Sequence, residues 1–224
     1  MKLISTEFGQ SFQPYLIEEL RPLNGGLHLP ALIAAIADRY KFASVPTLND
    51  ALQQGAKFAE GFLLFNEQII SIRQLGVYND GMIVVGWNTD ESDLILQDVM
   101  TWATQTFRLR EPITRTRRVY ISSVVVEFDF PIERVFHTLS EFIRIYEAAL
   151  KSAYDWEFPI EPTRITFGAD PTKMPQHRSA DFHIERRAGR SFPECRYFSS
   201  VPLRTSAHLD LLVRLENVIR EIGF

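Results

Sequence analysis

The feature that most constrains the fold is a run of three β-rich segments at about residues 56–65, 69–78 and 82–88. Two short turns separate the segments, Asn66-Glu67 and Asn79-Asp80-Gly81. A glycine in such a turn relieves the strain of a tight reversal, so the second turn is a strong hairpin signal. In the middle segment apolar and polar residues alternate, which is typical of a strand that is buried on one face only. The stretch therefore predicts three antiparallel strands.

The second half of the chain repeats this order of elements. A β-branched segment, "VYISSVVVEFDF" (119–130), predicts one long strand, and three shorter strands are expected at "RITFGAD", "ADFHIERR" and "ECRYFSSVP". Each half ends in an amphipathic helix, at about 89–107 and 205–222. The pattern predicts an α+β fold, a mainly antiparallel sheet with helices packed on one face. It also raises the hypothesis that two βββα-type units are related by duplication.

The expected domain organisation is a single α+β domain over 1–224. Residues 1–29 contain several prolines and glycines and are predicted to form an irregular N-terminal arm. Sub-units at about 30–107 and 118–224 remain an alternative description. A further helix is predicted to run to about residue 154. Its apolar stripe at helical spacing indicates packing into the core, and comprises Val135, Leu139, Phe142, Ile143, Tyr146 and Leu150.

Composition limits the class of protein. Hydrophobic residues make up 46% and charged residues 23% of the 224 residues, which are ordinary globular values. The single cysteine, Cys195, excludes an intramolecular disulfide. The longest apolar run, 29–37, is far too short for a membrane span, and the N-terminus does not resemble a signal peptide. We therefore expect a soluble, cytoplasmic protein, most simply bacterial, with no membrane partner.

Motifs that dictate a reaction are missing from the sequence. It contains no Walker phosphate loop, no dinucleotide-binding Gly-x-Gly-x-x-Gly, no Gly-x-Ser-x-Gly elbow and no His-Glu-x-x-His. Two cysteines for a zinc site are also lacking. These absences favour a binding role over catalysis, and we expect no cofactor.

One strand carries a combination of polar residues that suits catalysis or metal binding. If residues 180–187 are extended, the period of two places Asp181, His183, Glu185 and Arg187 on one face, with Phe182 and Ile184 on the other. Such a face offers ligands for a divalent metal or a general acid–base pair. The simpler interpretation is a solvated strand face, where mixed charges are common.

Arginines make a second candidate site. Their guanidinium groups give bidentate contacts to phosphates and carboxylates, and the candidate anion-binding residues are Arg117, Arg118, Arg187, Arg190 and Arg196. The net charge of −4 argues against a general nucleic-acid binder. The predicted role is thus an interaction protein that pairs with itself or with another protein. The alternatives are a hydrolase-like or nucleic-acid-processing enzyme and an arginine-lined nucleotide or RNA-binding module.

Overall fold

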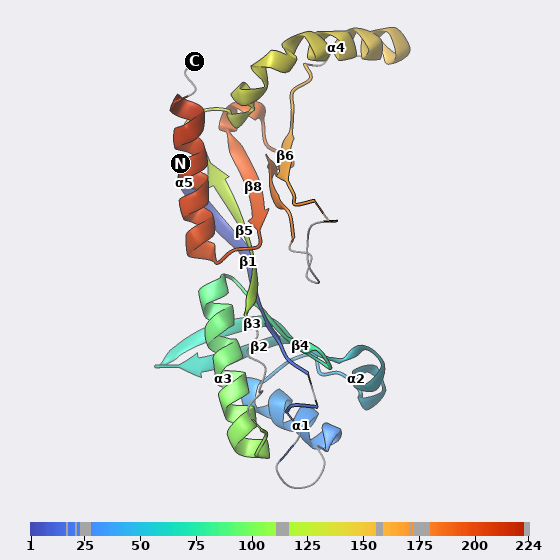
Figure 1. The fold of residues 1–224 in the computed structure, drawn as a ribbon, viewed down its shortest axis with the longest axis vertical. Helices are drawn as coiled ribbons and strands as arrows, with labels where there is room; N and C mark the ends of the chain where they lie inside the picture. The colour runs from blue at the N-terminus through green and yellow to red at the C-terminus, as the bar shows by residue number, and fades with distance from the viewer. Residues whose placement is uncertain are drawn as a thin grey trace. The chain divides into compact units, whose positions relative to one another are not determined.

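A computed structural model describes residues 1–16, 18–20, 22, 28–110, 117–155, 159–170, 172 and 180–221. Eight strands form one antiparallel sheet, with five α-helices and short 3-10 segments, so the predicted α+β class is confirmed (Figure 1). The order of the strands in the sheet is β2-β3-β4-β1-β5-β8-β7-β6.

The first half of the chain runs from a strand to a long helix. Its elements are β1 (Lys2–Pro14), α1 (Leu29–Tyr40), α2 (Leu48–Gln54), β2 (Ala56–Phe65), β3 (Gln68–Tyr78), β4 (Gly81–Gly86) and α3 (Thr89–Phe107). The three strands predicted at 56–88 are confirmed within two residues at each end. Helix α2 begins after Thr47, whose side chain accepts a hydrogen bond from the backbone N–H of Asp50.

The second half follows the same order. Its elements are β5 (Val119–Glu127), η1 (Ile132–Leu139), α4 (Ser140–Tyr154), β6 (Arg164–Phe167), β7 (Phe182–Arg186), η3 (Phe192–Glu194), β8 (Arg196–Val201) and α5 (Thr205–Glu221). Each half thus has a strand, a helical segment, three strands and a final helix. The sheet order reads the same from both ends, with β1 beside β4 and β5 beside β8. This topological repeat is longer than the βββα unit suggested by the sequence; common ancestry of the halves stays a prediction.

The chain divides into two compact units. Unit 1 comprises residues 1–5, 124–201 and 206–224, and unit 2 comprises residues 6–123 and 202–205. Both β1 and β5 contribute residues to each unit. The first sub-unit suggested by the sequence, 30–107, lies within unit 2. The second, 118–224, lies mostly within unit 1.

The core of unit 2 is formed by strands β2–β4 with helices α1 and α3. Apolar side chains of both helices, including Ile36 and Leu96, share one buried cluster with Phe58 and Leu75 of the strands. The two helices also meet directly, since the rings of Tyr40 and Trp102 lie 6.0 Å apart, edge to face.

The core of unit 1 is built on β5, β7 and β8, covered by η1 and α5. Val124 and Val126 of β5, Tyr197 of β8 and Leu212 of α5 are fully buried there. Ile132 anchors the start of η1 in the same cluster. The long run of β-branched residues in β5 therefore serves to bury one of the central strands.

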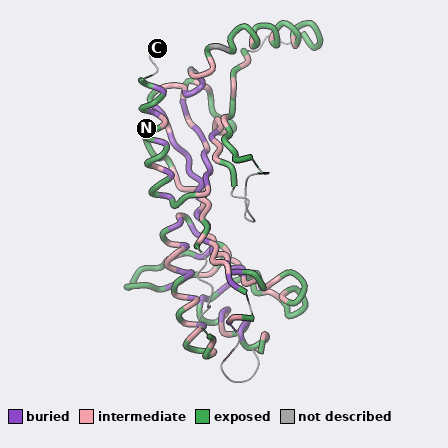
Figure 2. Tube along the Cα trace, viewed as in Figure 1, coloured by how far each residue is buried: buried purple, intermediate pink, exposed green. Residues whose placement is uncertain are grey.

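Two predictions are wrong. Residues 2–14 are not an irregular arm: they form β1, which pairs with β4 from Gly9↔Gly86 to Pro14↔Gly81. That pairing joins residues far apart in the sequence, which local punctuation cannot reveal. Helix α4, expected in the core, has no buried residue. Figure 2 shows its trace as exposed and intermediate only.

Candidate functional site

The strand face with Asp181, His183 and Glu185 is present but open. His183 and Glu185 lie on β7, opposite Ser200 and Phe198 of β8, while Asp181 is exposed just before the strand. Glu185 pairs with Arg164 of β6 at 3.7 Å. Partial burial and the charge of Arg164 lower the pKa of His183.

This face holds no metal centre in the described ranges, where no group of three or more histidine, cysteine, aspartate or glutamate side chains is placed to bind an ion. His177, a further candidate ligand near Asp181 in sequence, lies outside the described residues. The arrangement is that of a cross-strand charge pair on a partly solvated sheet. A catalytic role for Asp181, His183 and Glu185 stays an untested prediction.

The candidate anion-binding arginines belong to different units. Arg117 and Arg118 lie in unit 2, and Arg187, Arg190 and Arg196 in unit 1. Three of them already contact carboxylates. Arg118 pairs with Asp93 at 2.7 Å, Arg190 with Glu194 at 3.5 Å and Arg196 with Glu127 at 2.9 Å. A phosphate would have to displace these partners from Arg118, Arg190 and Arg196. An anion-binding role for the five arginines stays an untested prediction.

Unit 1 contains a buried charge pair that the sequence only partly indicated. Arg186 faces the interior, as its position on the strand predicts, and its side chain pairs with Glu133 of η1 at 2.8 Å. The Tyr197 hydroxyl donates to the same carboxylate at 2.7 Å. Burial raises the pKa of Glu133, opposed by the Tyr197 hydrogen bond and the Arg186 charge. Because Arg186 also lies over the Phe192 ring at 4.2 Å, this cluster joins η1 to β7 and η3.

A second buried polar pair joins β8 to α5. The Ser199 hydroxyl lies 2.9 Å from Nε2 of His208, and neither side chain is exposed. Ser199 also donates to the His183 carbonyl at 3.0 Å. A serine–histidine pair resembles a nucleophile and its base, but substrate cannot reach a fully buried hydroxyl. The pair is structural.

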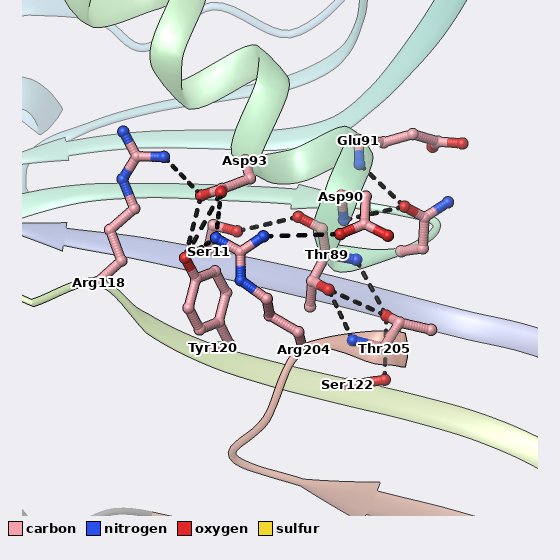
Figure 3. Close-up of polar contacts among 11 residues, drawn as sticks. Ser11, Thr89, Asp90, Glu91, Asp93, Arg118, Tyr120, Ser122, Arg204 and Thr205 are labelled. Carbon is pink, nitrogen blue, oxygen red and sulfur yellow. Dashed lines mark hydrogen bonds and ion pairs between the residues drawn. The ribbon is translucent and has the colours of Figure 1, made fainter. Parts of the chain in front are cut away.

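The close-up in Figure 3 shows a polar cluster within unit 2 that sequence reasoning missed. Thr89 and Thr205, at the starts of α3 and α5, bond reciprocally: each hydroxyl accepts from the other's backbone N–H, at 2.7 and 3.1 Å. Ser122 donates to the Thr205 hydroxyl at 3.2 Å. The reciprocal bonding satisfies a backbone donor at the N-terminus of each helix, where no intrahelical partner exists. No local motif could have predicted it, because the threonines are distant in sequence.

Beside the threonines, Asp93 is surrounded by donors. Its carboxylate pairs with Arg118 at 2.7 Å and with Arg204 at 2.8 Å, and the Arg204 guanidinium lies 4.6 Å from the centre of the Tyr120 ring (Figure 3). Asp98, further along α3, pairs with Arg39 at 2.9 Å. Asp93 and Asp98, two of the four carboxylates of α3, thus serve in internal ion pairs rather than in a cation site.

One face of α4 is an exposed apolar surface on a regular element. At 3.6 residues per turn, the apolar side chains of α4 occupy about half of its circumference. Phe142 is 64% exposed, Ile145 60% and Tyr146 46%. The Phe142 and Tyr146 rings stack on each other, with centroids 6.5 Å apart. We refer to Leu139, Phe142, Ile145, Tyr146 and Tyr154 as the α4 face.

The periodicity of the α4 face is visible in the sequence, where it predicts a helix packed in the core. Figure 1 instead shows α4 extending away from β5, β8 and α5 within unit 1. Apart from Ile160, whose N–H donates to Glu147 at 2.8 Å, the contacts of α4 are mainly with η1, which directly precedes it. The apolar side of α4 is therefore left uncovered by the described residues of unit 1.

Comparison of the chain with protein-family models gave no match, and comparison with curated proteins gave none either. Among the described residues, no helix is both long enough and apolar enough to cross a membrane. The candidate site is therefore defined by its geometry alone.

Proposed function

We propose that this protein is an interaction module that binds a protein partner through the α4 face. The observation that supports the proposal is a clean amphipathic helix with no buried residue. Apolar side chains at helical spacing normally pack against something, because burial of apolar surface is the main stabilising contribution in folding and association.

The size of the α4 face agrees with this role. At about 200 Å² for a fully exposed aromatic side chain, the exposed fractions of Phe142, Tyr146 and Tyr154 correspond to on the order of 350 Å². Leu139 and Ile145 add to this area. Contiguous apolar patches of more than a few hundred Å² are uncommon on monomeric proteins, and they typically mark protein–protein contacts.

Affinity capture with matched variants tests the proposal. The face variant carries Phe142→Ser and Ile145→Ser, and the control carries Arg144→Gln on the polar side of the same helix. Because α4 buries no side chain in the core, both variants should unfold at the wild-type denaturant concentration. The proposal is supported if the wild type and the control retain a protein that the face variant does not retain. That protein can be an untagged copy of the chain. Identical capture by all three, or no capture by any, contradicts it.

A further inference from the structure

We propose that the partner of the α4 face is a second copy of this chain, and that α4 of one copy packs on α5 of the other in a reciprocal exchange. This inference rests on the proposed function and specifies its partner. The surface that receives α4 is a strip of α5 formed by Leu211, Arg214 and Val218, which we call the α5 strip.

The first half of the chain shows where a helix in this topological position packs. Helix α1 follows β1 and precedes three strands, just as α4 follows β5 and precedes β6–β8. Helix α1 lies against α3, with Tyr40 on Trp102 and Arg39 paired with Asp98. In the second half the helix equivalent to α3 is α5, and the position beside it that corresponds to α1 is not filled by α4.

Alignment of α3 with α5 identifies the uncovered surface. The reciprocally bonded Thr89 and Thr205 begin the two helices and set the alignment. Leu96 then corresponds to Leu212, and both are fully buried.

The side of α3 that α1 covers corresponds to the α5 strip. Ile95, which is not exposed at all, corresponds to Leu211, which is 37% exposed. Trp102, which contacts Tyr40 of α1, corresponds to Val218, which is 53% exposed. The α5 strip is therefore apolar where α3 is apolar, but it lacks the covering helix.

The connection before α4 directs it away from its own α5. Leu139 ends η1, and Ser140 continues in right-handed helical geometry, with φ −56° and ψ −35°. Helix α4 thus starts directly after η1, which is kinked at Phe136 and anchored through the buried Ile132. Residues 15–28 separate α1 from β1, whereas residues 128–139, which include η1, separate α4 from β5. Because η1 is packed in the core and runs directly into α4, α4 is suited to reach a second copy rather than to fold back.

Charges on the two surfaces are complementary. Arg214 takes the position on α5 that Asp98 takes on α3, and it is exposed with no ion pair among the described residues. Glu141 borders the α4 face beside Ile145, held only by an exposed pair with Arg144 at 3.2 Å. Exposed pairs of this kind contribute little, so Glu141 is available to Arg214 of the second copy. In the first half an ion pair of reversed sign, Arg39–Asp98, joins α1 to α3.

The area available for burial is close to that of the smaller specific interfaces. Reciprocal exchange buries two α4 faces and two α5 strips. With on the order of 350 Å² from the aromatic rings of each α4 face, the total approaches the roughly 1,200–2,000 Å² of specific interfaces. Charges on α4, two acidic and two basic, cancel, so two copies approach without repulsion from this helix.

Sedimentation across a concentration series is the test. The wild type is expected to be a dimer, and Phe142→Ser on α4 or Val218→Ser on α5 should each weaken association by about tenfold or more. Val213→Ser, at an equally apolar position on the opposite side of α5 with 42% exposure, should leave the dimer unchanged. A wild type that stays monomeric at all concentrations overturns the proposal, as does a dimer that tolerates both substitutions.

Cysteine cross-linking establishes which chain supplies α4. Chains with Ala149→Cys are mixed with chains with Leu211→Cys under mild oxidation, both in a Cys195→Ser background. A disulfide between the two chains supports the exchange. A disulfide that forms only when both cysteines are on one chain shows closure of α4 on its own α5, and contradicts it. If the protein is monomeric while the face variant still loses a captured protein, this inference fails and the proposed function stands.

Discussion

His208 gives unit 1 a pH-dependent stability that can be measured directly. The imidazole is fully buried, with Nε2 2.9 Å from the Ser199 hydroxyl. Because that hydroxyl donates its one proton to the His183 carbonyl, Nε2 of His208 carries the proton that bonds to Ser199. The neutral and the protonated imidazole can both donate this hydrogen bond, so burial is what disfavours the charged form. Burial lowers the pKa of His208 to about 4, and the neighbouring His183 contributes in the same direction.

The sign and size of the effect follow from this pKa. Between about pH 4 and the ordinary value of 6.5, the unfolded chain binds a proton on His208 that the folded chain does not. The stabilisation is therefore complete above the unfolded pKa and is lost as the pH falls toward the folded pKa. The full difference corresponds to about 3 kcal/mol of unfolding free energy.

Urea unfolding of the wild type and of His208→Gln, from about pH 7.5 down to about pH 4, tests this reasoning. Glutamine keeps a hydrogen-bonding amide near Ser199 but does not titrate. The free-energy difference between the two proteins should shrink by about 3 kcal/mol toward acid, because only the wild type gains a proton on residue 208 when it unfolds and exposes the ring. A matched change at the exposed His137 controls for the loss of one histidine. Parallel curves for the wild type and His208→Gln would refute the argument.

Three further changes test the packing by equilibrium unfolding. Leu212→Ala removes a fully buried side chain from the unit 1 core and should cost about 2–5 kcal/mol; a cost below about 1 kcal/mol would mean that α5 is not packed as described. Thr205→Val leaves the N–H of Thr89 without its acceptor, and should cost about 1–3 kcal/mol, whereas an unchanged midpoint would contradict the reciprocal bonding. Glu133→Ala leaves Arg186 buried without its main partner and should cost about 3 kcal/mol; wild-type stability would show that the pair contributes nothing.

Secondary structure is largely predictable in this chain because it depends on local patterns. The alternation and turns at 56–88 place β2, β3 and β4 within two residues of their observed ends. The apolar stripe locates helix α5, and the period of two places Arg186 on the interior face of β7. Strand β1 escapes prediction because its pairing with β4 joins residues more than 60 positions apart, and because the prolines and glycines of residues 1–29 are typical of a loop.

Only the local features of the candidate site, and not the residues that surround them, can be predicted from the sequence. The sequence shows the apolar stripe of α4, but periodicity says only that a helix has a side to bury, not what covers it. The strand face of His183 and Glu185 is correctly placed on one side of β7, yet its environment depends on Arg164 and Phe198, which other strands supply. The bonds between Thr89 and Thr205 have no local signal at all.

By itself, the sequence determined the α+β class, the three-strand runs and the amphipathic helices, since each follows from short-range spacing of apolar, polar and turn residues. Only the tertiary structure decided that the two halves share one topology, that Arg186 and His208 are buried with partners, and that the apolar side of α4 stays outside the core. Those outcomes depend on contacts between distant residues, whose energies outweigh local preference. An apolar stripe on a helix fits a core position when the fold covers it. It fits a binding surface when, as on α4, the rest of the fold leaves it uncovered.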